Sequence, residues 1–171
     1  MFEIPDKVAI VTGSTRGIGL AIAQALGQAG AKIVVSSRRK ENCEDDLRHL
    51  KSQGIEAISQ PCNMSKRDQV EQLVNKAVSQ YGRLDIVVGN AAANPFYGSL
   101  TDIEDAAFEK IFATNLQGNL WLCKAALPHI ANAGGGSVIM ISSIAALRGS
   151  KGECLWGFQG CADPADPQFG G

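Results

Sequence analysis

Val8-Ala9-Ile10-Val11-Thr12-Gly13-Ser14-Thr15-Arg16-Gly17-Ile18-Gly19 contains the strongest structural signal in this chain. It begins as a short β-branched run typical of a strand, passes through three glycines and continues with helical periodicity. The apolar residues of that predicted helix face are Ile18, Ala21, Ile22, Ala25, Leu26 and Ala29. Glycine allows positive φ and a close approach of backbone N–H groups, and a helix N-terminus attracts anions. Strand, glycine turn and helix in this order predict a phosphate site for a dinucleotide, with a plain tight turn as the alternative.

The second predicted strand, Lys32–Ser37, indicates which nucleotide is bound. It arrives about 20 residues after the glycines, where a carboxylate would accept a hydrogen bond from the ribose 2'-hydroxyl of NAD. The strand end instead offers Ser36, Ser37, Arg38 and Arg39, and no acidic residue precedes Glu41. Together with Arg16 in the glycine turn, these side chains predict a cationic pocket for a 2'-phosphate, which favours NADP over NAD. A solvated basic turn is the alternative.

Length and composition indicate one α/β domain, predicted to span residues 1–152. The 171 residues are 45% hydrophobic and 19% charged, and the net charge is −1. The chain has no dense stripe of Lys and Arg, no apolar run of transmembrane length and no leader pattern at its start. We therefore expect a cytoplasmic protein with no nucleic-acid or membrane partner. Five cysteines without a Cys-x2-Cys pair suit a reducing compartment, and His49 and His129 lie far from any cysteine pair, so no metal site is predicted.

Strand and helix patterns alternate along the rest of the chain. Three further strands are predicted at Ile55–Ile58, Leu84–Val88 and Ser137–Ser142. Two helices are predicted from apolar positions at helical spacing. The helix before the fourth strand has Val70, Leu73, Val74, Ala77, Val78 and Tyr81 on its apolar face. The helix before the fifth strand has Leu116, Leu120, Cys123, Ala126, Leu127 and Ile130. The alternation predicts a Rossmann-like α/β fold, a doubly wound parallel sheet in three αβα layers. Ligands of such sheets bind beyond the carboxyl ends of the strands.

The residues at those strand ends resemble the short-chain dehydrogenase/reductase family over residues 6 to about 150. Four motifs in order carry the resemblance: Thr12-Gly13-x3-Gly17-Ile18-Gly19, Gly89-Asn90-Ala91-Ala92, Asn115 at the start of the long helix, and Ile141-Ser142-Ser143. Two further stretches, Asn90–Phe96 and Ser36–Arg38, are similar to the NADP-linked carbonyl reductase branch. The implied activity is hydride transfer between a nicotinamide cofactor and a small-molecule carbonyl or secondary alcohol.

The resemblance also implies a role for each matching position. It places Gly13, Arg16, Gly17, Ile18 and Gly19 around the pyrophosphate, and Ser37, Arg38 and Arg39 at the 2'-phosphate. It places Asn63 and Met64 at the adenine, and it makes Asn90 and Ala91, in the loop after the fourth strand, cofactor-binding residues as well. Three positions depart from the family pattern: Asn63 replaces the usual Asp, and Gly89 and Ala92 replace the first Asn and the Gly of an Asn-Asn-Ala-Gly motif. Asn90 as a cap of its strand end and Asn115 as a helix N-cap are the structural alternatives.

The family's chemistry uses four side chains, of which this chain supplies two. Asn115 matches the Asn that holds a water in the proton relay, and Ser143, or Ser142 one residue earlier, matches the Ser that hydrogen-bonds the substrate oxygen. The Tyr general acid/base and the Lys four residues after it are missing near residue 156, where Trp156 and Gly160 stand. The resemblance therefore implies an oxidoreductase whose catalysis is impaired in this chain.

The composition changes abruptly after Gly152, and segment 153–171 is predicted to be an aberrant, disordered tail. Our hypothesis is that an insertion or deletion near residue 153 displaced the reading frame, so that the last strands and helices of the family fold are lacking. A natural tail with its own role is the alternative.

The missing segment has consequences for partners. Full-length relatives are expected to be homo-oligomers. Without the helix that normally covers it, the apolar stripe of the helix from Asn115 to Ile130 would be exposed and prone to aggregation. Two further hypotheses stay open, a non-catalytic nucleotide-binding module and an interaction protein that docks on a full-length relative.

Overall fold

The computed structural model describes residues 3–96 and 100–143. Tyr97 and segment 153–171 lie outside the described residues. The elements are β1 (Val8–Thr12), α1 (Gly17–Gln28), β2 (Lys32–Ser36), α2 (Lys40–Ser52), β3 (Ala57–Ser59), α3 (Arg67–Tyr81), β4 (Ile86–Gly89), the 3-10 turn η1 (Leu100–Asp102), α4 (Asp105–Phe112), the π-helical turn η2 (Ala113–Gln117), α5 (Gly118–Asn132) and β5 (Ser137–Met140).

The five strands form one parallel sheet in the order β3-β2-β1-β4-β5. β1 lies at its centre, where Val11 pairs with Val35 of β2 on one side and with Val88 of β4 on the other. The chain moves outward through β2 and β3 and then returns to place β4 beside β1, so the strand order reverses between β1 and β4. This confirms the predicted doubly wound α/β sheet. The usual ligand position of such a sheet lies between the loops that follow β1 and β4.

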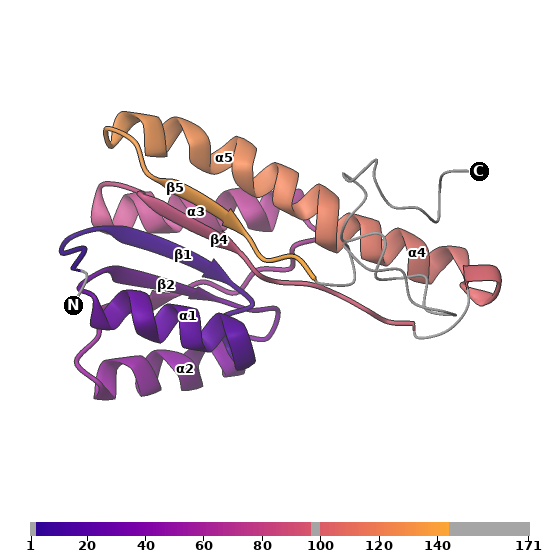
Figure 1. Cartoon of the computed structure of the whole chain (residues 1–171), viewed down its shortest axis with the longest axis horizontal. Helices are drawn as coiled ribbons and strands as arrows, with labels where there is room; N and C mark the ends of the chain where they lie inside the picture. The colour runs from indigo at the N-terminus through magenta and orange to yellow at the C-terminus, as the bar shows by residue number, and fades with distance from the viewer. Residues whose placement is uncertain (1–2, 97–99, 144–171) are drawn as a thin grey trace.

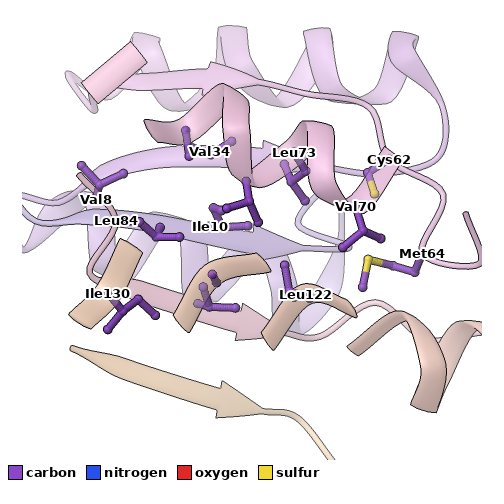
Figure 2. Close-up of a cluster of buried hydrophobic side chains, with 14 residues drawn as sticks. Val8, Ile10, Val34, Cys62, Met64, Val70, Leu73, Leu84, Leu122 and Ile130 are labelled. Carbon is purple, nitrogen blue, oxygen red and sulfur yellow. The ribbon is translucent and has the colours of Figure 1, made fainter. Parts of the chain in front are cut away.

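Helices cover both faces of the sheet (Figure 1). α1 and α2 lie on one face, over a core that includes Val11, Val35 and Leu50. α3 and α5 lie on the other face, where side chains such as Ile10 and Leu122 meet (Figure 2). β1 and β2 supply both cores from alternate residues. Burial on two faces therefore explains why these strands are nearly continuous apolar runs without a polar alternation.

The predicted apolar face of α1 is partly wrong. Ile18 is 64% exposed, and Ala21 and Ala25 are exposed as well, whereas Gly19 and Ala23 are buried. Because Gly19 has no side chain, the start of the helix packs directly on the backbone of the glycine turn. This close contact directs the Gly19–Ala23 side of α1, and not the Ile18 side, toward the sheet.

Several element boundaries differ from the predicted ones. The second strand ends at Ser36, the third begins at Ala57, the fourth begins at Ile86 and extends to Gly89, and the fifth ends at Met140. The sequence pattern does not predict α2 or α4 at all. α2 buries only Cys43 and Leu50 among its 13 residues, so it carries too few apolar positions to show a helical period.

The predicted exposure of the apolar stripe on the last helix is confirmed for part of that stripe. Leu116, Leu120 and Leu127 are 39%, 52% and 51% exposed, while Ala126 and Ile130 are buried. The residues of β5 are exposed along the whole strand. In the part of the chain that the structure describes, no helix has the length and apolarity needed to cross a bilayer.

Asp85 connects the amino ends of β1 and β4. Its carboxylate accepts hydrogen bonds from the Lys7 ammonium at 3.0 Å, the Val8 backbone N–H at 3.0 Å and the Arg83 guanidinium at 2.8 Å and 2.6 Å. Burial alone would raise the pKa of Asp85, but these hydrogen bonds outweigh it and lower the pKa to about 2. The carboxylate therefore stays ionised at neutral pH and holds the two strands in place at the end of the sheet opposite the predicted site.

Candidate functional site

The glycine turn after β1 has a backbone geometry that favours glycine. Gly13 and Gly17 have φ angles of +62° and +53°, in the left-handed region. A Cβ on Gly19 would collide with the carbonyl oxygen of Gly13. Ser14 fixes the turn to β2, because its buried Oγ accepts a hydrogen bond from the Ser36 N–H at 2.9 Å. The three glycines of the motif thus form one compact turn at the switch point of the sheet.

The N-terminus of α1 at this turn is suited to an anion. Its N-cap residue, Arg16, has an extended backbone (φ −169°, ψ 164°) and makes no side-chain capping hydrogen bond, and no acidic residue lies in the first turn. Arg16, Gly17 and Ile18 are exposed. Uncapped N–H groups and the helix dipole favour a phosphate at such a position. The turn and the start of the helix therefore fit the pyrophosphate of a dinucleotide.

A second basic segment lies beside the turn, at the end of β2. Thr12 and Ser36 are register partners, so the residues that follow them lie next to each other. Arg38 and Arg39 are exposed. Ser37 Oγ donates a hydrogen bond to the Arg39 carbonyl oxygen at 3.1 Å, which uses its single hydroxyl proton within the turn. A phosphate at this place would therefore be bound by the arginines, with Ser37 shaping the turn.

Thr12 and Asn90 join the glycine turn to the loop after β4. The Thr12 hydroxyl donates to the Val88 carbonyl oxygen at 3.2 Å and accepts from the backbone N–H groups of Asn90 and Ala91, both at 3.0 Å. The Asn90 side chain donates to the carbonyl oxygens of Thr12 at 2.9 Å and Gly13 at 3.1 Å. Asn90 does cap a strand end, but the end belongs to β1 and not to its own strand β4. The role of the Thr12 hydroxyl is missed by sequence reasoning, because threonine at the end of a buried strand is explained by β-propensity alone.

Asn115 lies inside the π-helical turn η2 between α4 and α5. Its predicted position at the start of a helix and its alternative role as an N-cap are both wrong, because the helical backbone already begins at Asp105. Its Oδ1 accepts from the Ala93 N–H at 2.8 Å, and its Nδ2 donates to the Ala93 carbonyl oxygen at 3.1 Å. Asn119 Nδ2 donates to the Asn115 carbonyl oxygen at 2.7 Å. Asn115 thus clamps the loop after β4 onto the helix, in a type of turn that is frequent at functional sites.

Gly89, which stands where the family pattern has Asn, is enclosed by two side chains. A Cβ at this position would overlap Met140 Sδ of β5 and lie 2.8 Å from Asn119 Oδ1 of α5. This Asn119 oxygen is buried and has no hydrogen-bond partner among the described residues. Neighbouring side chains therefore occupy the space that the usual Asn would need.

The two residues predicted at the adenine lie in different environments. Asn63 is half-buried, and its Oδ1 accepts hydrogen bonds from the Ser65 N–H at 3.1 Å and the Ser65 Oγ at 2.9 Å. Met64 is 3% exposed, and its side chain belongs to the core between the sheet, α3 and α5 (Figure 2). Asn63 therefore keeps some exposed surface, whereas Met64 is buried with its carbonyl group packed against Gly118.

Ser142 and Ser143 follow β5 at the same edge of the sheet. The Ile141 N–H donates to the Gly89 carbonyl oxygen at 2.9 Å, which keeps this segment beside the loop after β4. Ser142 is exposed and Ser143 is half-buried. The positions near residue 156, where the family pattern has Tyr and Lys, lie outside the described residues. Within residues 3–96 and 100–143, no group of three or more His, Cys, Asp or Glu side chains could hold a metal ion.

Comparison with known proteins identifies the family. Residues 7–157 match the family model for short chain dehydrogenases. The chain belongs to the short-chain dehydrogenase family. Members of this family are oxidoreductases that use NAD(P) cofactors, and the family membership and Rossmann-like fold suggested by the strand-end motifs are confirmed.

The relatives of this short-chain dehydrogenase include mammalian and plant proteins. It is 43% identical over 143 residues to "Dehydrogenase/reductase SDR family member 4" of Bos taurus, an alignment that covers 84% of this chain and 51% of that protein. The protein of the same name from Homo sapiens is 42% identical over 149 residues, with 87% and 54% covered. "Tropinone reductase-like 3" of Erythroxylum coca is 40% identical over 151 residues, with 88% and 58% covered. The chain thus spans about half the length of the curated relatives it matches.

Proposed function

We propose that this chain binds NADP at the carboxyl end of its sheet, and that the activity of its lineage is hydride transfer to or from a small carbonyl or secondary alcohol. The observation that carries the proposal is the glycine turn. Gly13 and Gly17 hold the left-handed backbone, and the α1 N-terminus is uncapped and exposed. These groups would bind the pyrophosphate through backbone N–H groups.

The preference for NADP over NAD is supported by charge. Arg38 and Arg39 are exposed at the end of β2, and Arg16 is exposed on the adjoining turn. The segment that follows β2 offers no carboxylate before Glu41 to accept a hydrogen bond from a ribose hydroxyl. Guanidinium groups bind phosphate through charge-assisted hydrogen bonds, so they favour the nucleotide that carries the additional 2'-phosphate.

Asn115 and Ser143 have separate roles in this proposal. The nicotinamide, when bound, supplies the hydride chemistry at its C4. The Ser143 hydroxyl would hold the substrate oxygen, and Asn115 keeps the bordering loop in place through Ala93. Trp156 stands near the position where the family pattern has Tyr, and an indole cannot exchange a proton with the substrate oxygen as a phenol does. We therefore expect cofactor binding with impaired turnover in this chain.

Nucleotide binding is tested by titrating the purified chain with NADPH and with NADH and following the change in nucleotide fluorescence. The expected result is tighter binding of NADPH. Arg38→Ala should weaken NADPH binding about tenfold and leave NADH binding unchanged, because it removes one charge-assisted contact to the 2'-phosphate. Arg48→Ala, on the exposed side of α2, removes the same charge away from the site and is the matched control. Absence of NADPH binding at millimolar concentration would refute the proposal.

We attribute the absent Tyr and Lys to a displaced reading frame from about residue 153 onward. The support is the abrupt change of composition after Gly152. In the displaced frame, tyrosine between Leu155 and Trp156 requires a Leu155 codon of CTA or TTA. Sequencing the coding DNA tests this, and any other leucine codon contradicts it.

A second candidate function, docking on a full-length relative, is favoured by the exposed leucines of the last helix. Leu116, Leu120 and Leu127 form an apolar stripe in contact with solvent, and such patches mark protein contact sites. Co-expression of the tagged chain with a full-length relative tests this function. The relative should co-purify with the wild-type chain and not with a Leu120→Lys variant.

A further inference from the structure

The thiol of Cys43 contacts three atoms of Ser37, the first residue after β2. Its Sγ accepts a hydrogen bond from the Ser37 N–H at 3.2 Å and lies 3.3 Å from Ser37 Oγ. It also donates to the Ser37 carbonyl oxygen at 3.7 Å. Cys43 is fully buried in the first half of α2. A side chain with no exposure therefore holds the backbone of a residue at the edge of the proposed nucleotide site, and its sulfur packs against the hydroxyl of that residue.

The contacts of Ser37 extend to both sides of the turn. Its hydroxyl donates to the Arg39 carbonyl oxygen at 3.1 Å, and its own carbonyl oxygen accepts from the Cys62 N–H at 2.9 Å. Arg38 lies between the two tied residues Ser37 and Arg39 and is exposed. The direction in which the chain presents Arg38 is therefore set by a hydrogen-bond group to which Cys43 contributes a buried thiol.

We propose that Cys43 is a positioning residue that determines the preference for the 2'-phosphorylated nucleotide. It would not touch the nucleotide itself, and it acts by fixing Ser37 and thereby the placement of Arg38 and Arg39. The proposal rests on the proposed binding of NADP. It predicts that loss of the thiol weakens the binding of the nucleotide with a 2'-phosphate, because only that phosphate contacts Arg38 and Arg39. The affinity for the nucleotide with a free 2'-hydroxyl should be unchanged, because both nucleotides bind the glycine turn through their pyrophosphate.

The chemistry of the side chain provides a graded series of variants. Cys43→Val keeps an apolar side chain of similar volume but neither donates nor accepts a hydrogen bond. Cys43→Ser retains one donor and an acceptor, so it should restore the contacts to Ser37. Cys62→Val is the matched control, because Cys62 is equally buried and contacts Ser37 only through its backbone N–H.

The experiment measures the dissociation constants of NADPH and NADH for the wild type and these variants by fluorescence titration. Cys43→Val should weaken NADPH binding about tenfold, the effect of one lost hydrogen bond to a charged group, and change NADH binding by less than about twofold. Cys43→Ser and Cys62→Val should keep the wild-type preference. If Cys43→Val does not fold, Cys43→Ala removes the same contacts without a branched side chain.

The outcomes separate this inference from the proposed function. A wild-type chain that binds neither nucleotide overturns both. A wild-type chain that prefers NADPH, with Cys43→Val keeping that preference, overturns the role of Cys43 alone. An equal loss of NADPH and NADH affinity in Cys43→Val shows a general structural role and also overturns the inference. Amide hydrogen exchange of Ser37 gives a second readout, since it should accelerate in Cys43→Val and not in Cys62→Val.

Discussion

Replacement of Thr12 by valine tests the connection between the glycine turn and the loop after β4. Thr12 is 1% exposed, and its hydroxyl accepts hydrogen bonds from the Asn90 and Ala91 N–H groups at 3.0 Å. Valine has nearly the same shape, so the change removes these acceptor contacts without creating a cavity. Each orphaned N–H costs about 1–3 kcal/mol when buried. Because Asn90 and Ala91 are only half-buried, we take the lower part of that range and expect a loss of about 2–3 kcal/mol.

Urea unfolding followed by circular dichroism measures this loss. A stability change of about 2–3 kcal/mol is large beside a typical total of about 5–15 kcal/mol, and it moves the midpoint by about 1–2 M urea. Thr12→Ser is the control, because it keeps the hydroxyl and loses one methyl group, at a cost of about 1 kcal/mol. The reasoning is refuted if Thr12→Val is as stable as Thr12→Ser. NADPH affinity should fall with Thr12→Val and stay near the wild-type value with Thr12→Ser.

Three further changes test other parts of the fold and site. Gly19→Ala places a Cβ 2.5 Å from Asn90 Nδ2 and against the glycine turn, so NADPH affinity should fall by about tenfold or more as phosphate-facing N–H groups move; an unchanged titration contradicts this. The pKa of Asp85 is lowered to about 2 in the folded chain, against about 3.9 in the unfolded chain. The ionised carboxylate therefore contributes about 2 kcal/mol of stability above about pH 3.9, and this contribution is lost as the pH falls toward 2. The stability of Asp85→Asn, measured by acid unfolding, should lack this pH dependence. The double variant Leu120→Lys, Leu127→Lys should stay monomeric in size-exclusion chromatography at protein concentrations at which the wild-type chain aggregates. Its free energy of unfolding should change by less than about 0.5 kcal/mol, because both side chains are half exposed. Aggregation of the double variant at the same concentration as the wild type contradicts the role of the stripe.

The sequence predicts the sheet and the glycine turn well because both depend on local patterns. The run from Val8 to Thr12 is buried on both faces, and the left-handed backbone at Gly13 and Gly17 requires the residue type found there. Helix faces are predicted less well. The face of α1 depends on how closely Gly19 approaches the turn, and α2 buries too few residues to show a period.

The site itself is predicted in its motifs but not in its connections. Two sets of contacts join one element of the fold to another. They are the hydrogen bonds that Thr12 accepts from Asn90 and Ala91, and the contact of Cys43 with Ser37. Such contacts depend on tertiary packing, so the spacing of residues in the sequence does not predict them. The π-helical turn that contains Asn115 cannot be predicted from helical periodicity either. It adds about one residue to one turn, and a segment of five residues is too short for this change of period to appear in the sequence. Residue types at strand ends can be recognised from the sequence, whereas the partners of each side chain come from the fold.

The enclosure of Gly89 by Met140 and Asn119 constrains how this branch of the family can diverge. Restoring the common Asn at position 89 by one substitution would force a side chain into space that Met140 and Asn119 already fill. A return to the common motif therefore requires the thioether of Met140 to swing aside, which its flexible and partly exposed side chain allows, and the buried amide of Asn119 to move as well. Position 119 should consequently change together with position 89 among descendants of this chain, whereas Met140 can stay.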